Sequence, residues 1–268
     1  MNAEEPLRRE FDAVVDDMKS ALGFLTRLPE SILGPVTAVR PDFRRAARVF
    51  PLVGAVVGLI GGATLMVADW LGLPPAIAAS LAVLATVIVT GGLHEDGLAD
   101  TADGFGGGRT AAEKLEIMDD SRIGAFGGTA LIFSLLLRVE ALTGFAAWSP
   151  TRAGLALIVA ETVSRAAMVR LWHALPAART SGLAHETGAP DQSAMLTALA
   201  IAAAAIVLLA VPAIGLRGAL LGTVLVVAAA YGFTRLTAQL IGGRTGDTLG
   251  CCQQIALVAF LAGATAHG

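Results

Sequence analysis

The sequence predicts an all-α protein, a polytopic membrane helix bundle of about seven transmembrane helices, with six as the alternative count. Hydrophobic residues make up 55% of the 268 residues and charged residues only 15%, against roughly 25% charged in a soluble domain. The mean hydropathy is +0.70, and the apolar residues form runs of about 20, long enough to cross a ~30 Å hydrocarbon layer. A membrane β-barrel is excluded, because its strands would be short and alternating. We therefore treat residues 1–268 as a single integral membrane domain.

Residues 1–48 are charged and contain an amphipathic helix. Its apolar residues recur every three or four positions, with acidic residues between them. These apolar residues are Phe11, Val14, Val15, Met18, Leu22, Leu25 and Leu28. The segment is too charged to span a bilayer. We predict that it is cytoplasmic, and that it lies on the membrane surface or packs under the bundle.

Seven apolar runs follow, and each predicts one membrane span. Their bounds are Val49 to Ala68, Pro74 to Leu93, Gly124 to Thr143, Ala153 to Leu171, Ala194 to Ile214, Gly218 to Leu236 and Gly246 to Ala266. The count of six arises because the third and fourth runs carry charges and the last is interrupted by Gly and Gln. Trp70, Trp148 and Trp172 lie at predicted span ends, where amphipathic rings favour the headgroup layer.

The basic residues predict the orientation, because cytoplasmic loops retain Lys and Arg. With the N-terminus inside, the outer loops contain only Arg152 and Arg217 of the 19 Lys and Arg residues, and most of the others lie on the cytoplasmic side. The C-terminus is then outside if seven spans are present. The formal net charge of −3, without a block rich in Lys and Arg, argues against nucleic acid as a partner.

The longest polar stretch between spans is residues 94–123, which we predict to be a cytoplasmic acidic active-site loop. Asp96, Asp100 and Asp103 stand at i, i+4 and i+7, so on a helix continuing from the second span they project from one face. Like charges on one stripe repel, and a divalent cation among them would relieve the repulsion. An all-oxygen set of ligands suits Mg²⁺ or Mn²⁺ rather than zinc. The alternative is a solvated acidic helix end that binds no ligand.

A second polar segment, residues 242–250, lies on the same predicted side. It presents Arg244, Thr245 and Asp247 among glycines at the start of the last span. A helix start of this kind suits an anion, and Asp247 is a candidate fourth metal ligand. The alternative is that Asp247 or Thr248 only caps the last helix.

Charged residues also occur inside the predicted spans. Glu161 and Arg165 stand at i and i+4 in the fourth span, where charges are costly and must pair or face a polar cavity. A structural ion pair and a substrate contact explain them equally well. Arg138 and Glu140 lie toward the outer half of the third span, and we expect a structural role for them. Acidic metal ligands, glycine loops and arginines on one face point to chemistry on a phosphate or pyrophosphate.

Six blocks resemble the cobalamin synthase family, the adenosylcobinamide-GDP ribazoletransferases, and they occur in the family's order over nearly the whole chain. The blocks are Gly23–Pro29, Phe50–Gly54, Gly91–Gly104, Glu116–Gly127, Ser164–Ala166 and Gly242–Gly250. The most specific are Asp-Gly-Leu-Ala-Asp-Thr-Ala-Asp-Gly and Asp-Ser-Arg-Ile-Gly. The chain departs from the family at Glu95, where many members have another residue. It departs again at Gln253 and Gln254, where relatives often carry an acidic residue.

The resemblance implies a magnesium-dependent transferase of the bacterial inner membrane, and the orientation predicted from the basic residues places its active site on the cytoplasmic face. Such an enzyme joins adenosylcobinamide-GDP to α-ribazole or α-ribazole 5′-phosphate, and releases GMP. The product is adenosylcobalamin or its 5′-phosphate. The expected partners are these substrates and membrane lipid, with further copies of the chain or other late cobamide-pathway enzymes as additional candidates.

For this reaction we assign three roles. The predicted metal ligands are Asp96, Asp100, Asp103 and Asp247. The predicted substrate-binding residues are Arg122, Arg165, Arg244 and Thr245. Glu95 or Asp119 is the candidate to take the proton of the attacking hydroxyl, although a metal and good geometry can make a dedicated base unnecessary.

Two other functions remain as alternatives. A CDP-alcohol phosphotransferase-type lipid enzyme also has a multi-Asp metal site in a membrane bundle, but its longer spacing and the Ala-Arg pair after its first Asp-Gly are absent here. A non-enzymatic transporter would use Glu161 and Arg165 as pathway charges. Against the transporter, the polar motifs gather at one membrane face rather than at the midplane.

Overall fold

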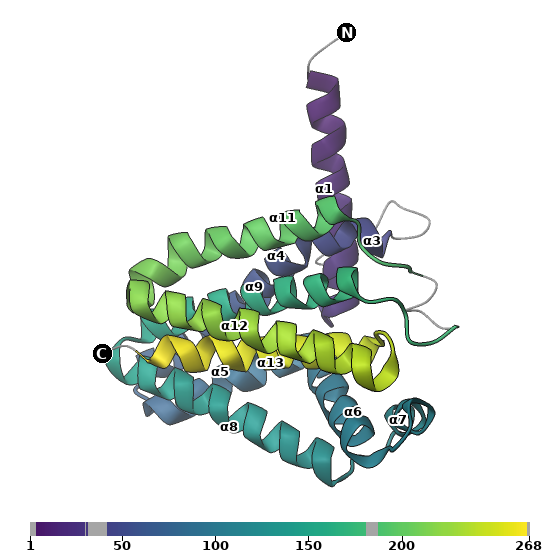
Figure 1. Ribbon diagram of the computed structural model, residues 1–268. Coiled ribbons are helices and arrows are strands. Elements are labelled where there is room, and N and C mark those ends of the chain that lie inside the picture. Colours follow the sequence, from purple (N-terminus) through teal and green to yellow (C-terminus); the bar gives the residue numbers. More distant parts are fainter. Residues whose placement is uncertain (1–3, 30, 32–41, 181–186, 267–268) are drawn as a thin grey trace.

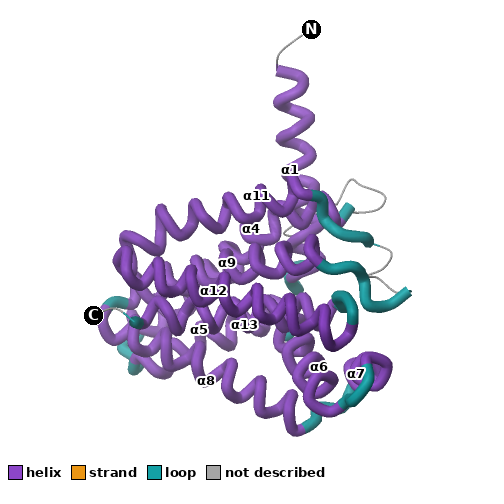
Figure 2. The backbone as a smooth tube through the Cα atoms, in the orientation of Figure 1, coloured by secondary structure: helices purple, strands orange, loops and turns teal. Residues whose placement is uncertain are grey.

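The computed structural model describes residues 4–29, 31, 42–180 and 187–266. In this part of the chain the regular structure is helical (Figure 2), with one isolated β-bridge between Ala177 and Arg244. The all-α prediction is confirmed. Parts of the predicted N-terminal segment, residues 1–3, 30 and 32–41, lie outside the described residues.

The helices are numbered along the chain as in Figure 1. They are α1 (Glu4–Leu25), α3 (Phe43–Ala46), α4 (Phe50–Trp70), α5 (Pro75–Thr90), α6 (Leu93–Gly107), α7 (Ala111–Met118), α8 (Ala125–Trp148), α9 (Pro150–Ala174), α11 (Gln192–Ala205), α12 (Val211–Ile241) and α13 (Gly246–Thr265). A 3-10 turn, η1 (Ala47–Val49), precedes α4, and a π-helical turn, η2 (Ile206–Ala210), joins α11 to α12.

Each predicted apolar run corresponds to a helix, but fewer than seven separate spans qualify by length and hydropathy. Among the described residues four segments qualify, or five if α5 and α6 together form one broken span. The four are Phe43–Trp70, Ala125–Trp148, Gln192–Ile241 and Gly246–Thr265. The multi-pass membrane architecture is confirmed, and the count of seven is not.

Two physical features account for the difference between seven and five, and the shortness of α5, with 16 residues, accounts for the count of four. The segment Gln192–Ile241 is a continuous helical stretch of 50 residues that contains two predicted spans. It bends sharply at Gly215, whose φ of 78° is left-handed, and α11 and α12 run in opposite directions (Figure 1). The other feature is α9, which contains Glu161 and Arg165 and is less apolar than its neighbours.

Helix α9 lies at the centre of the bundle, and its residues from Ala153 to Trp172 are almost all buried. Helix α4 packs against it through glycines spaced four residues apart. A Cβ on Gly58 would lie 2.6 Å from the Cα of Ile158, and one on Gly62 would lie 3.2 Å from the Cα of Gly154. Small residues of this kind let helix backbones approach closely inside a membrane.

Helix α1 is amphipathic, as predicted, and projects beyond the bundle (Figure 1). Met18 and Leu22 pack against the core, whereas the side chain of Phe11 is 68% exposed. Asp17 is buried on the packed face and accepts hydrogen bonds from Arg45 and Arg48, at 2.9 and 2.8 Å. These ion pairs fasten the last turns of α1 to the segment before α4.

Residues 94–123 are not a loop as predicted but consist mainly of two helices, α6 and α7. Gly91 and Gly92 both adopt left-handed φ values, 65° and 71°, which few other residues adopt readily. They turn the chain by 89° between α5 and α6. The three aspartates therefore lie on a helix, as predicted, but that polar helix does not continue the second span.

We expect Gly58→Ala to lower the free energy of unfolding in detergent by about 1–3 kcal/mol, because its methyl group would overlap the backbone of α9. Gly144→Ala is the matched control. Gly144 lies in α8 with nothing within 4 Å of the position its Cβ would take, so the control should keep or raise stability. Chemical denaturation of the purified variants measures both, and equal stability of the two would contradict this packing.

Candidate active site

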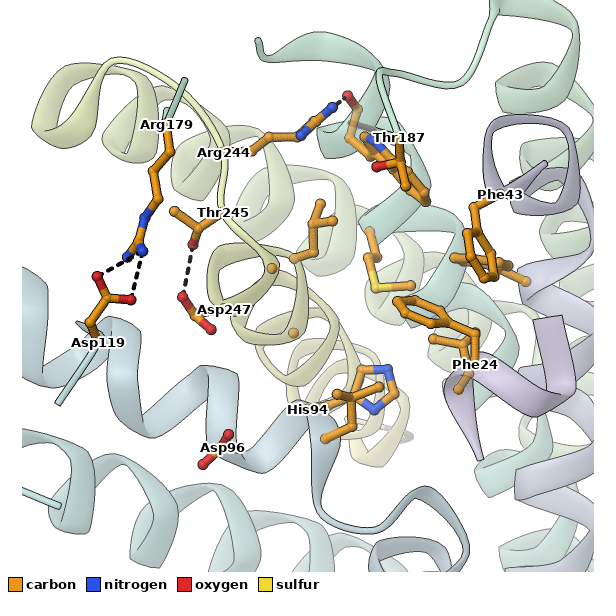
Figure 3. A pocket seen from close by; sticks show the side chains of 18 residues that line it. Phe24, Phe43, His94, Asp96, Asp119, Arg179, Thr187, Arg244, Thr245 and Asp247 are labelled. Atoms are coloured by element: carbon orange, nitrogen blue, oxygen red, sulfur yellow. Dashed lines mark hydrogen bonds and ion pairs between the residues drawn. The ribbon is translucent and has the colours of Figure 1, made fainter. Parts of the chain in front are cut away.

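A cavity of about 420 Å³ lies where α1, α3, α6, α9 and the segment before α13 meet (Figure 3). Its volume is within the range of small-molecule sites. One part of its lining is polar and contains His94, Asp96, Asp119, Arg179, Thr187, Arg244, Thr245 and Asp247. The other part is apolar and contains Phe24, Leu25, Phe43, Phe50, Leu93, Met168, Trp172 and Leu249.

A close crossing of α6 and α13 brings two of the predicted metal ligands to this cavity. A Cβ on Gly97 would lie 2.7 Å from the carbonyl oxygen of Asp247, and one on Gly250 would lie 3.2 Å from the Cα of His94 in α6. The absence of side chains at this crossing allows Asp96, next to Gly97, and Asp247 to face the same space. Two acidic residues far apart in sequence thus line one end of the cavity.

Asp100 follows Asp96 by one turn of α6 and is half-buried. Burial, followed by repulsion from nearby carboxylates, raises the pKa of Asp100 to about 6, as expected when like charges share a site. Those carboxylates belong to Asp96, Asp247, Asp103 and Asp119. In the described part of the chain, no group of three or more His, Cys, Asp or Glu side chains is arranged to hold a metal ion. The carboxylates are neighbours without being a preassembled metal site.

Asp103, a predicted metal ligand, is bonded to the start of α8. Its two carboxylate oxygens accept hydrogen bonds from the backbone N–H groups of Gly124 and Gly127, at 2.7 and 2.9 Å. These groups belong to the first turn of α8, where a carboxylate is favoured by otherwise unpaired N–H groups and by the helix dipole. Asp103 is buried and does not line the cavity.

The glycine-rich segment before α13 begins where α12 ends, at Gly242 in the left-handed conformation. Thr245 caps α13, because its hydroxyl accepts from the N–H of Thr248 while the Thr248 hydroxyl accepts from the N–H of Thr245. The cap is therefore Thr245, and not Asp247 or Thr248 acting alone. The Thr245 hydroxyl also donates to the Asp247 carboxylate at 3.1 Å, which orients that carboxylate at the cavity wall.

Two arginines line the polar part of the cavity. Arg244 is buried, donates to the carbonyl oxygens of Gly188 and Trp172 at 2.5 and 3.3 Å, and lies over the Trp172 ring. Arg179 pairs with Asp119 at 2.6 Å. A short backbone pairing between Ala177 and Arg244 holds the two arginine segments side by side.

The other two predicted arginines lie elsewhere. Arg122 is exposed and pairs with Asp120, two residues before it, rather than lining the cavity. Arg165 is fully buried in α9 and pairs with Glu161 at 2.5 Å. Glu161 and Arg165, the charges that a transporter would use, therefore neutralise each other inside the bundle.

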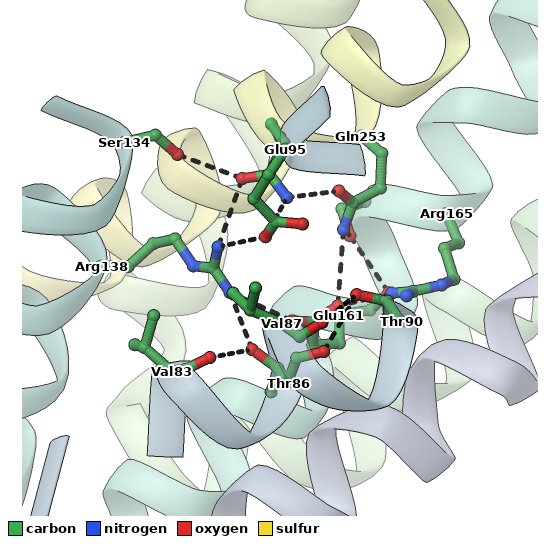
Figure 4. Close-up of polar contacts among 12 residues, drawn as sticks. Val83, Thr86, Val87, Thr90, Glu95, Ser134, Arg138, Glu161, Arg165 and Gln253 are labelled. Atoms are coloured by element: carbon green, nitrogen blue, oxygen red, sulfur yellow. Dashed lines mark hydrogen bonds and ion pairs between the residues drawn. The ribbon is translucent and has the colours of Figure 1, made fainter. Parts of the chain in front are cut away.

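Glu95 belongs to a buried polar network beneath the cavity (Figure 4). Its carboxylate accepts from Arg138 at 2.8 Å and from the Gln254 amide at 3.0 Å. Arg138 also donates to the hydroxyl of Thr86 at 2.8 Å, while Gln253 donates to Glu161 and Ser164. Glu95 does not line the cavity, so the structure does not favour it as the proton acceptor.

His94 lies between this network and the cavity, and its role was not predicted. The ring is 2% exposed, and its Nε2 has no hydrogen-bond partner among the described residues. Burial, together with the charges of Arg165 and Arg138, holds the pKa of His94 well below its usual range.

Comparison with known proteins places the chain in a family. The profile of the family described as cobalamin-5-phosphate synthase matches residues 17–265. This chain belongs to that family. No solved structure matches it.

Three relatives, each named adenosylcobinamide-GDP ribazoletransferase, show the extent of the similarity. The protein of Azorhizobium caulinodans is 49% identical over 251 residues, covering 93% of this chain and 95% of the relative. That of Xanthobacter autotrophicus is 47% identical, covering 95% and 97%. That of Brucella melitensis biotype 1 is 41% identical, covering 94% and 97%.

In this member of the cobalamin-5-phosphate synthase family, five of the ten predicted site residues line the cavity. The predicted residues that line it are Asp96, Asp119, Arg244, Thr245 and Asp247. The lining also contains His94 and Arg179, for which the sequence predicted no role. His94 lies within the acidic block, which is a signal that was available, whereas Arg179 follows α9 without a motif around it.

We expect Arg138→Met to destabilise the protein by about 3–5 kcal/mol, because it leaves Glu95 buried without its cation. Adding Glu95→Gln should recover part of this loss, since a neutral amide costs less to bury than an unpaired carboxylate. Glu140→Gln, an exposed change on the same helix, is the control and should keep or raise stability, because it removes a charge from the span. Thermal unfolding in detergent of Arg138→Met, Glu95→Gln, Glu140→Gln and the variant that combines Arg138→Met with Glu95→Gln measures the coupling. If the effects of the Arg138 and Glu95 substitutions on stability simply add in the double variant, the two side chains do not interact directly.

Proposed function

We propose that this protein is a transferase of cobalamin biosynthesis that joins adenosylcobinamide-GDP to α-ribazole or its 5′-phosphate and releases GMP. The observation that carries the proposal is the cavity at which Asp96, from one block of the sequence, meets Arg244 and Asp247 from another. Relatives that share these blocks over nearly their whole length are named for this transfer.

The reaction exchanges one phosphorus–oxygen bond for another. A ribose hydroxyl of the acceptor attacks the phosphorus nearer the corrinoid, and the bond from that phosphorus to the bridging oxygen breaks as GMP leaves with that oxygen. Arg244 and Arg179 line the cavity where negative charge develops, and planar guanidinium groups suit phosphate oxygens. Asp119 lines the same wall and is the better placed of the two predicted bases to accept the hydroxyl proton.

We also propose that Mg²⁺ assists the transfer and is held by Asp96, Asp100 and Asp247. Support comes from the oxygen donors of these residues and from the raised pKa of Asp100, since a cation would relieve the crowded negative charge. Mg²⁺ commonly binds through one or two carboxylates together with substrate phosphates. The carboxylates are not preassembled, as expected if the pyrophosphate of the substrate supplies the remaining ligands of the metal ion. When bound, the ion would neutralise charge on the phosphate oxygens.

We expect Asp96→Asn and Asp247→Asn each to lower turnover at least a hundredfold while the proteins still insert and fold. The loss follows from removing a charged ligand to the metal and its phosphate. Asp69→Asn, an exposed change at the end of α4, is the matched control and should keep wild-type turnover. Release of GMP and formation of a new corrinoid by reconstituted protein, measured over a Mg²⁺ titration, test this.

Near-normal turnover of both variants at ordinary Mg²⁺ would contradict the assignment of the metal site. If the wild-type protein released no GMP with either α-ribazole or its 5′-phosphate, the proposed transfer itself would be contradicted. The two results are separable, because the first requires an active wild-type enzyme.

We propose an inner-membrane location with the N-terminus and the cavity on the cytoplasmic side. The support is the distribution of basic residues, which predicts that loops on the cavity side are retained inside. The end of α13 lies at the opposite end of the bundle from α6 and α7 (Figure 1), as expected if that helix crosses the membrane once.

We expect Arg109→Cys to react with a membrane-impermeant maleimide only in inverted vesicles, and Thr151→Cys only in right-side-out vesicles. Both positions are exposed, and they lie between α6 and α7 and at the start of α9. The native Cys251 and Cys252 are buried, so the background should be low. Labelling of position 109 in right-side-out vesicles would overturn the orientation.

A further inference from the structure

Aromatic rings from four helices converge on the apolar part of the cavity. Phe24 comes from α1, Phe43 from α3, Phe50 from α4 and Trp172 from α9. The ring centroids of Phe24 and Phe43 are 4.8 Å apart, those of Phe24 and Phe50 6.4 Å, and those of Phe50 and Trp172 5.9 Å. The whole chain has only ten Phe, three Trp and one Tyr. We call these four residues the aromatic cluster.

The aromatic cluster and the carboxylates lie on different parts of the same cavity. Figure 3 shows Phe24 and Phe43 on one side, Asp96, Asp119 and Asp247 on the other, and His94 between them. A ligand that fills both parts has a flat apolar group at one end and a hydroxyl or phosphate at the other. The volume of about 420 Å³ suits a nucleoside and is too small for a corrinoid that carries a nucleotide.

We propose that the aromatic cluster is the binding site for the planar base of α-ribazole, and that it directs the ribose of this acceptor toward the carboxylates. The inference rests on the proposed transfer and identifies where one of its two substrates binds. Aromatic side chains stack on the faces of flat heterocycles. A base held in this way would present its sugar to the part of the cavity that contains Asp96 and Arg244.

The chemistry of the cluster favours this base over the guanine of the donor. Guanine has a polar edge that needs hydrogen-bond partners, and leaving it unpaired in an apolar site is costly. Phenylalanine rings supply no such partners, and the indole N–H of Trp172 already donates to the carbonyl oxygen of Gly188 at 2.8 Å. A benzimidazole, which is mostly apolar, loses little by burial there.

The walls of this subsite are held in place before any ligand binds. Asp17 on α1 is 2% exposed and bonds to Arg45 and Arg48. These contacts connect the helix that carries Phe24 to the segment between Phe43 and Phe50. Fixed aromatic walls reduce the entropy cost of ordering a ligand between them.

The test replaces a flat ring with a branched apolar side chain of similar size. In Phe24→Leu and Phe43→Leu we expect the KM for α-ribazole to rise about tenfold, in line with the stacking lost per base. The KM for adenosylcobinamide-GDP and the kcat at saturating acceptor should stay within about twofold of wild type. Phe24→Tyr keeps a ring and should keep the wild-type KM for the acceptor. Phe11→Leu, an exposed change on the same helix, is the matched control.

A binding measurement makes the inference independent of turnover. Equilibrium dialysis of α-ribazole with the purified proteins, without donor, should show the same weakening in Phe24→Leu and Phe43→Leu. The free benzimidazole base should compete with α-ribazole for the wild-type protein, and less effectively for these variants. An unchanged affinity for α-ribazole in both variants, or a rise confined to the KM for the donor, would overturn the subsite.

The same experiments separate this inference from the proposed function. Binding of α-ribazole that depends on Phe24, in a wild-type protein that releases no GMP, would support the subsite and refute the transfer. Normal GMP release in both leucine variants, with wild-type KM for the acceptor, would refute the subsite alone. Unfolding temperatures of the variants show whether a loss comes from misfolding. If it does, competition between the free benzimidazole base and α-ribazole for the wild-type protein decides, and an absence of competition would refute the subsite.

Discussion

The contact between α6 and α13 is the constraint on which the candidate site depends. The two helices cross at Gly97 and Gly250, where neither carries a side chain that would separate them. This crossing brings an acidic helix near the middle of the chain to the start of the last helix, and so places Asp96 beside Asp247 in one cavity. The carboxyl groups repel each other, so the apolar packing of the surrounding helices must offset that repulsion.

The buried network of Glu95 and Arg138 supports the same arrangement from below. Glu95 adjoins Asp96 in sequence, and its bonds to Arg138 on α8 and Gln254 on α13 connect α6 to both helices. Gln254 is suited to this position, because its amide donates to Glu95 while its carbonyl oxygen accepts from Arg138. A carboxylate at position 254 could not donate to Glu95. Gln254 therefore has a structural role in this network.

Much of the fold followed from one-dimensional patterns, because apolar length and amphipathic spacing are local properties of the chain. The seven apolar runs and the amphipathic character of α1 belong to this class. What could not be derived depends on contacts between distant residues. Asp103 shares a helical face with Asp96, but the position of the α8 N-terminus makes it a cap. Arg122 stands in a specific motif, yet its nearest charge is Asp120.

The position of α1 has a consequence for how this protein is studied. Phe24, which forms part of the cavity wall, and Phe11, which is largely exposed, are on the same helix. Whatever surrounds the outer end of α1, whether headgroups, detergent or water, therefore contacts the same helix that forms part of the cavity wall. Lipid composition belongs among the experimental variables, alongside pH and salt.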